Sequence, residues 1–200
     1  MSITFLNKVT LSLSAKFTFS KSMDEKLWKK CIDFHGHVCP GLAFGYKASE
    51  TAAEILRIPM EKAKDEEIVC ISENDACGVD CIQYLLSCTV GKGNLLFRVT
   101  GKPVYTFFRR DSKKGIRLVV RDFNKDLYSR EELIQHILDS PADDIFDISE
   151  PRFKLPEKAR KFQSITCECC GESAREDKIR LQDGKKVCLD CFESYERSFL

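Results

Sequence analysis

The sequence lacks the features that would direct a protein into a membrane, onto nucleic acid or out of the cell. It has no apolar run of the roughly 18 residues that a membrane-spanning helix needs. Its 32 Lys and Arg nearly balance 31 Asp and Glu, and a net charge of +1 gives little attraction to nucleic acid or anionic lipid. Residues 1–22 have neither a basic start nor an unbroken apolar stretch, so we expect no secretory signal. We therefore expect a cytoplasmic protein with no membrane or nucleic acid partner.

Histidine is scarce in this chain, whereas cysteine is abundant. There are three His and eleven Cys among the 200 residues. In a protein that is not exported, cysteines are expected to be reduced thiols and metal ligands rather than disulfides, and their odd number agrees with this. The hydrophobic fraction of 43% suits a globular protein with one ordinary domain and a small appendage.

The order of the predicted elements indicates an α+β fold with helices packed on a small antiparallel sheet. Helices are expected over residues 24–34, 40–57, 78–88 and 129–140, and strands over residues 66–72, 95–99, 104–110 and 116–122. Ser129 and Glu132 form a capping box at the start of the last helix. In the last strand, alternation directs Ile116 inward and Arg117 and Arg121 outward.

Four parts of the chain are expected. They are an N-terminal extension (1–22), an α+β core domain with a Cys/His site (23–150), a linker (151–166) and a four-cysteine zinc finger (167–200). Pro151 and Pro156 fall in a segment without clear periodicity, which is typical of a connection.

The C-terminal part holds two Cys-x2-Cys pairs separated by 17 residues: Cys167 and Cys170, then Cys188 and Cys191. This spacing is typical of a structural zinc site, and zinc would supply the folding energy that so small a core lacks. Gly171 follows the first pair, where a zinc knuckle often needs a positive φ. A hairpin turning at Asp183-Gly184 and a helix that begins at the second pair are expected, in the order of a treble-clef finger. Cys169 is a spare thiol.

A second Cys/His group lies in "FHGHVCPG" at residues 34–41. His35, His37 and Cys39 occupy the connection between two predicted helices, and Pro40 places Cys39 at a helix start, where unsatisfied amides favour a thiolate. If Cys77 on the third helix faces Cys39, these four side chains form a site for zinc or another thiophilic metal. A Cys39–Cys77 redox pair or an iron–sulfur cluster held by four cysteines are the alternatives. Cys39 and His37 are the candidate catalytic residues.

Other polar and sulfur-containing residues lie close to this group in the sequence. Asp80 is a candidate proton carrier, or more simply a helix cap or polar contact. Cys81 and Cys88 share a helix face with Cys77, and their participation stays open. Cys31 and Cys70 are expected to act as small buried hydrophobes.

Three motifs resemble the E subunits of formylmethanofuran dehydrogenases and their relatives. They are "FHGHVCPGLAFGYKASETA" at 34–52, "CGVDCIQYLLSCTVGKGNLLF" at 77–97 and "YTFFRR" at 105–110. The finger "CECCGE…CLDCF" resembles an auxiliary module of some members. The resemblance implies an α+β core, often dimeric, with an appended treble clef, and a link to the molybdenum or tungsten enzyme that reduces carbon dioxide onto methanofuran in methanogens. The family motif includes the positions of His35, His37, Cys39 and Cys77, whereas at Cys81 the family commonly has alanine.

Two functions remain open from the sequence. The first is a cytoplasmic, homodimeric metalloprotein, accessory to an anaerobic one-carbon or redox enzyme complex, with zinc in the finger and a second metal of unknown identity in the core. The second is a non-enzymatic adaptor whose finger binds a protein or nucleic acid partner. The sequence does not decide whether the protein is an enzyme.

Overall fold

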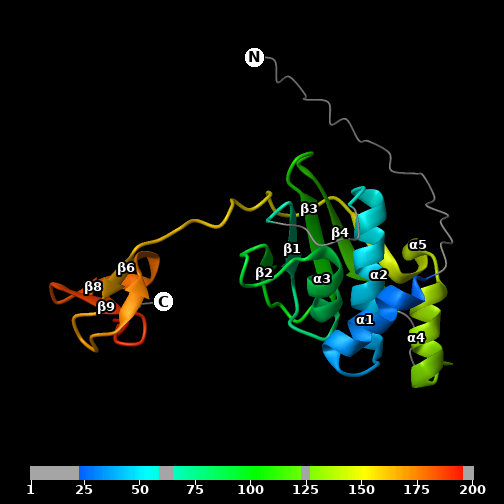
Figure 1. Ribbon diagram of the computed structural model, residues 1–200, viewed down its shortest axis with the longest axis horizontal. Coiled ribbons are helices and arrows are strands. Elements are labelled where there is room, and N and C mark those ends of the chain that lie inside the picture. Colours follow the sequence, from blue (N-terminus) through cyan, green and yellow to red (C-terminus); the bar gives the residue numbers. More distant parts are fainter. Residues whose placement is uncertain (1–22, 59–64, 123–126, 196–200) are drawn as a thin grey trace, which may run out of the picture. The chain divides into compact units, whose positions relative to one another are not determined.

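The computed structural model describes residues 23–58, 65–122 and 127–195 (Figure 1). The chain divides into two compact units, of which the first ends at Lys158 and the second begins at Ala159. The extension expected over residues 1–22 lies outside the described residues. Within the described ranges, no helix is both long enough and apolar enough to cross a bilayer.

The first unit is built on a five-stranded sheet with the order β2-β1-β3-β4-β5. The strands are β1 (Ile68–Ser72), β2 (Leu95–Phe97), β3 (Val104–Arg109), β4 (Lys114–Val120) and β5 (Phe146–Ser149). β1 and β2 are parallel, and the other neighbouring strands are antiparallel. The sheet is therefore mixed, whereas the sequence predicted an antiparallel one. Helix α3 lies between β1 and β2 in the chain and supplies the crossover that a parallel pair requires.

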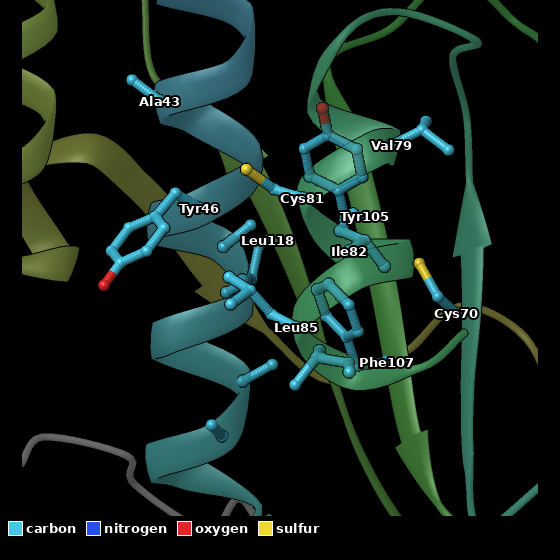
Figure 2. Close-up of a cluster of buried hydrophobic side chains, with 14 of the residues drawn as sticks. Ala43, Tyr46, Cys70, Val79, Cys81, Ile82, Leu85, Tyr105, Phe107 and Leu118 are labelled. Carbon is cyan, nitrogen blue, oxygen red and sulfur yellow. The ribbon is translucent and has the colours of Figure 1, made fainter. Parts of the chain in front are cut away.

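The helices of this unit share one hydrophobic core with one face of the sheet. They are α1 (Glu25–His35), α2 (Pro40–Ile55), α3 (Gly78–Leu86), α4 (Arg130–Asp139) and the short α5 (Ala142–Ile145). Tyr46 of α2 and Ile82 of α3 are buried together with Phe107 and Leu118 of the sheet (Figure 2). The predicted α+β class is confirmed. The sequence did not predict α5 and β5.

Helices α2 and α3 approach each other closely at two glycines. A methyl group placed on Gly45 would overlap the backbone carbonyl of Gly78, and one on Gly78 would overlap the hydroxyl of Tyr105. Because no larger residue fits at either position, the two glycines set the distance between the helices. Both helices begin near this contact, at Pro40 and Gly78.

The second face of the sheet is covered by residues that the sequence assigned to the linker. Val69, Ile71 and Phe108 of the sheet pack against Phe153 and Leu155. Part of the segment between β5 and the second unit therefore belongs to the core of the first unit.

This cover explains the position of Arg117, which differs from the prediction. Arg117 is on the face directed away from the helices, as expected, but it is only 3% exposed and forms a 2.9 Å ion pair with the buried Glu73. The prediction of a solvated side chain is wrong because the second face of the sheet is covered and because Glu73 neutralises the charge. Arg121 is exposed, as predicted, and pairs with Asp147.

The second unit contains two small hairpins. The first pairs β6 (Ser164–Thr166) with β7 (Ser173–Arg175), and the second pairs β8 (Ile179–Gln182) with β9 (Lys185–Cys188). The second hairpin turns at Asp183 and Gly184, both with positive φ, as predicted.

The helix expected after the second cysteine pair is not present in residues 189–195. Its short apolar pattern has little core to pack against, since Leu189 is 46% and Tyr195 83% exposed. A helix this short is marginal without tertiary packing, so the pattern alone does not form one.

Candidate metal centres

The structure brings together the four core residues that the sequence singled out. One ligand atom from each of His35, His37, Cys39 and Cys77 lies within 4.8 Å of the others. His35 ends α1, Cys39 is the N-cap of α2 and Cys77 is the N-cap of α3. The group is therefore held by the ends of three packed helices.

Both thiols lie at helix N-termini. The Leu42 amide donates a hydrogen bond of 3.3 Å to the Cys39 sulfur, whereas the Cys77 side chain makes no capping hydrogen bond. The positive end of each helix dipole attracts negative charge, so both positions suit a thiolate that is bound to a metal ion. Gly41 leaves room for the pair, because a Cβ at this position would lie 3.8 Å from both sulfurs and 3.2 Å from the Cys77 Cβ.

His35 is oriented by a carboxylate from α3. Its Nδ1 lies 2.7 Å from an Asp80 oxygen, and Gln83 donates a 3.0 Å hydrogen bond to the other oxygen of that carboxylate. The opposite ring nitrogen, Nε2, faces the Cys39 sulfur at 3.9 Å. A carboxylate behind a histidine is the usual outer partner of a metal ligand, since it fixes both tautomer and ring orientation. The sequence named Asp80 only as a proton carrier or polar contact, because nothing local connects it to His35.

His37 is the most exposed of the four residues. Its ring lies against that of His35, with 4.4 Å between the ring centroids and 40° between the ring planes. Its neighbour Val38 is 41% exposed, whereas Cys39 is only 7% exposed. The centre is therefore open to solvent on the side of His37 and closed on the side of Cys39.

The Cys77 thiol resists ionisation when no metal is bound. Burial, followed by the neighbouring Cys39 thiol, raises the pKa of Cys77 above its usual value. Because a metal binds the thiolate, it must displace this proton, and binding therefore weakens as the pH falls.

The other core cysteines lie outside this group of four. Cys81 and Cys88 are both 0% exposed. The Cys88 thiol donates to the Ile68 carbonyl at 3.7 Å. Neither sulfur belongs to the group of ligand atoms that converge at the centre, so the described residues form a mixed Cys/His set there and not a four-cysteine set.

The four cysteines of the second unit also converge, with their sulfurs within 4.8 Å of one another: Cys167, Cys170, Cys188 and Cys191. Amide hydrogen bonds from Cys170, Cys188 and Cys169 lower the pKa of Cys167 to about 6. Gly171 has φ +78°, as the knuckle prediction requires. The Cys169 side chain is exposed, and its sulfur is not in the group.

Family comparisons agree with both parts of the chain. A family model described as "FmdE, Molybdenum formylmethanofuran dehydrogenase operon" matches residues 34–147. The chain belongs to the FmdE family. This match includes all four residues of the core centre and confirms the resemblance seen in the sequence. A second model, "Prokaryotic dksA/traR C4-type zinc finger", matches residues 160–197, so this FmdE protein carries a C-terminal zinc finger.

Individual relatives extend the comparison. A "Probable S-adenosyl-L-methionine-binding protein" of Archaeoglobus fulgidus is 30% identical over 85% of this chain, which spans only 53% of that relative. The crystal structure of an FmdE-like protein of the tungsten formylmethanofuran dehydrogenase type, from Syntrophus aciditrophicus, has a TM-score of 0.59 and 22% identity, covering 84% of this chain and 90% of the other. The second likeness shows that the two proteins share a fold.

Proposed function

We propose that this FmdE protein holds two metal ions, a structural zinc in the finger and a thiophilic ion in the core. The observation that carries the second ion is the convergence of His35, His37, Cys39 and Cys77 within 4.8 Å. The 2.7 Å contact between Asp80 and His35 supports it, because it orients the imidazole as a metal-binding site requires.

The donor set fits a soft or borderline divalent cation. Two imidazoles and two thiolates are a frequent zinc set, and thiolates disfavour magnesium and calcium, which select oxygen ligands. When bound, the ion would supply a Lewis acid for polarising a carbonyl or a water molecule.

The residues of the centre differ in how firmly they are held, and this suggests a division of roles. His35 is fixed by Asp80, and Cys39 is fixed by the amide of Leu42. His37 is exposed, and its ring lies tilted against that of His35. His37 would be the ligand most easily exchanged for a small molecule, and Cys39 would be the ligand that holds the ion most firmly. This arrangement makes the centre suitable for catalysis rather than only for structure.

The cellular role that we propose is an accessory one in anaerobic one-carbon or redox metabolism. The family description names a molybdenum formylmethanofuran dehydrogenase operon, which supports this context. Reduced thiols at both centres suit the cytoplasm. We further propose that the protein acts as a homodimer, which analytical ultracentrifugation would test by a mass of twice 22.9 kDa.

Metal analysis of purified, reduced protein tests the two-ion proposal. We expect two ions per chain in the wild type, one in Cys39→Ser and two in the control Cys169→Ser, whose side chain is exposed and outside the finger's ligand group. A single ion in both the wild type and Cys39→Ser would refute the core ion. That result would favour an adaptor whose only metal is in the finger.

A further inference from the structure

A small pocket adjoins the two thiols of the core centre. It has a volume of about 180 Å³ and lies between the start of α2, the residues on either side of Cys77 and the segment before β3. Gly41 belongs to both sites, because it lines the pocket and a Cβ at its position would lie 3.8 Å from the sulfurs of Cys39 and Cys77. The pocket and the core centre therefore share a wall.

Tyr105 of β3 places a hydroxyl group on the pocket wall. The residue lines the pocket and is only 3% exposed. A Cβ placed on Gly78 would lie 2.4 Å from its hydroxyl oxygen, and Gly78 directly follows Cys77 in the chain. Figure 2 shows the Tyr105 ring beside α3, with the hydroxyl directed toward the end of the helix that bears Val79. The hydroxyl therefore lies at the start of α3, next to a ligand of the core centre.

The side chain of Asn74 holds two walls of the pocket together. Its nitrogen donates a hydrogen bond of 3.1 Å to the Lys102 carbonyl, and its oxygen accepts one of 3.2 Å from the Ala76 amide. Asn74 is itself buried and lines the pocket. These bonds join the segment before β3 to the residues before α3, so the pocket is formed before a ligand binds, as is usual for small-molecule sites.

The lining of the pocket suits a small, uncharged group. None of the described residues that line it has a charged side chain, and Phe44 and Val120 make part of its wall apolar. A charged group placed there would lose its hydration without gaining a partner of opposite charge. The volume is below the roughly 300 Å³ at which pockets for drug-sized ligands begin. The Tyr105 phenol can donate a hydrogen bond to an acceptor on the ligand.

We propose that this pocket is the ligand subsite of the core centre and that it takes a small uncharged carbonyl compound, whose oxygen accepts a hydrogen bond from the Tyr105 hydroxyl. The inference rests on the proposed core ion, because a carbonyl is the group that a Lewis acid beside the pocket would polarise. Binding in the pocket makes and breaks no covalent bond. The absence of charge on the lining and the Tyr105 donor together select the ligand.

Acetone and acetate are suitable probes, because they have similar size and shape but differ in charge. Full-length protein, reduced and loaded with zinc, is titrated with each probe, and binding is followed by the NMR shifts of the Gly41 and Gly78 amides. We expect acetone to bind more tightly than acetate by on the order of tenfold, since the pocket offers no partner for a charge. Tyr105→Phe should weaken acetone binding by about fivefold, the contribution of one neutral hydrogen bond.

Two pairs of variants separate the pocket from general effects on the fold. Tyr84→Phe is the control for Tyr105→Phe, since Tyr84 also packs against the core but does not line the pocket, and it should leave acetone binding unchanged. Ala76→Leu should abolish binding by filling the pocket, whereas Asp75→Leu adds a leucine at an exposed neighbour outside the lining and should keep it. The proposal is overturned if acetate binds as tightly as acetone, or if Ala76→Leu and Tyr105→Phe bind acetone like the wild type.

Loading with cobalt(II) in place of zinc tests whether the pocket lies beside the ion and does not depend on the pocket variants. The methyl protons of acetone should relax faster with the wild type than with Cys39→Ser, which is expected to keep only the ion of the finger. Equal relaxation would overturn the assignment as a subsite of the core centre. Metal analysis of the same samples separates the two proposals. One ion per chain in the wild type refutes the core ion, whereas two ions without acetone in the pocket refute this inference alone.

Discussion

Replacement of Asp80 by alanine should weaken metal binding at the core centre without unfolding the protein. The contact that is lost is the 2.7 Å pair between the Asp80 carboxylate and His35 Nδ1. Loss of such an outer partner typically costs a metal site about 10- to 100-fold in affinity. The Asp80 side chain is 35% exposed, so water replaces part of what is lost. We therefore expect about tenfold, which corresponds to ~1.4 kcal/mol.

The assay is competition for zinc against a chromophoric chelator, with the finger already loaded. Asp80→Asn should lie between the wild type and Asp80→Ala, because an amide oxygen still accepts from Nδ1 but carries no charge. Asp33→Ala is the control, since it removes an exposed carboxylate of α1 two residues from His35.

Asp80 also lies in the first turn of α3, where a carboxylate stabilises the helix. Loss of this helix stabilisation lowers the melting temperature of the metal-free and metal-bound forms alike. Measuring the melting temperature of both forms therefore separates it from a loss of metal affinity. If Asp80→Ala binds zinc within twofold of the wild type, the orienting role assigned to this carboxylate is wrong.

Two further predictions concern packing and pH. Gly45→Ala should lower the melting temperature by several degrees, because the added methyl overlaps the Gly78 carbonyl and overpacking costs about 1–3 kcal/mol. The zinc affinity of the finger should fall more steeply with falling pH below about 6, because below the pKa of Cys167 one further thiol must lose its proton to bind the ion. Since this pKa is lowered in the folded finger, its contribution to stability is complete above the ordinary thiol pKa and is lost as the pH falls through the lowered one.

For each of these two predictions, one measurement can give a result that contradicts it. Gly91→Ala is the control for packing, because nothing lies within 4 Å of a Cβ placed at that position. Equal melting temperatures for Gly45→Ala and Gly91→Ala would contradict the close approach of α2 and α3. For the finger, the zinc affinity is measured between pH 8 and pH 5 by competition with a zinc-sensitive dye. An equal pH slope of the affinity above and below pH 6 would contradict the lowered pKa of Cys167.

The sequence predicted those features of the fold that depend on neighbouring residues. The capping box of Ser129 and Glu132 is present, and Asp183 and Gly184 form the predicted turn. In both cases the side chain or backbone freedom that fixes the geometry lies within a few residues of the feature.

Features that depend on distant partners were not predictable in this way. Arg117 is buried because of Glu73, which is 44 positions away, and because residues 151–158 cover that face. The parallel pairing of β1 and β2 likewise depends on how α3 returns the chain to the sheet. No local pattern contains either kind of information.

The candidate site shows the same division. The spacing of His35, His37 and Cys39 marked one half of the core group in the sequence, and Cys77 could be added from the expected helix packing. The Asp80–His35 contact was missed, since it depends on the register of α1 against α3. Helix periodicity gives the face on which a residue lies, but not the residue opposite it.

The position of the core ligands has a consequence for the unfolded chain. Cys39 and Cys77 are 38 positions apart, and each begins a different helix. An ion held by both residues would act as a cross-link. By the reasoning used for disulfides, a cross-link that closes a loop of this length lowers the entropy of the unfolded ensemble and thereby raises its free energy by ~4 kcal/mol at room temperature. In a reducing compartment, where a disulfide does not persist, such an ion would supply the topological constraint that exported proteins obtain from oxidation.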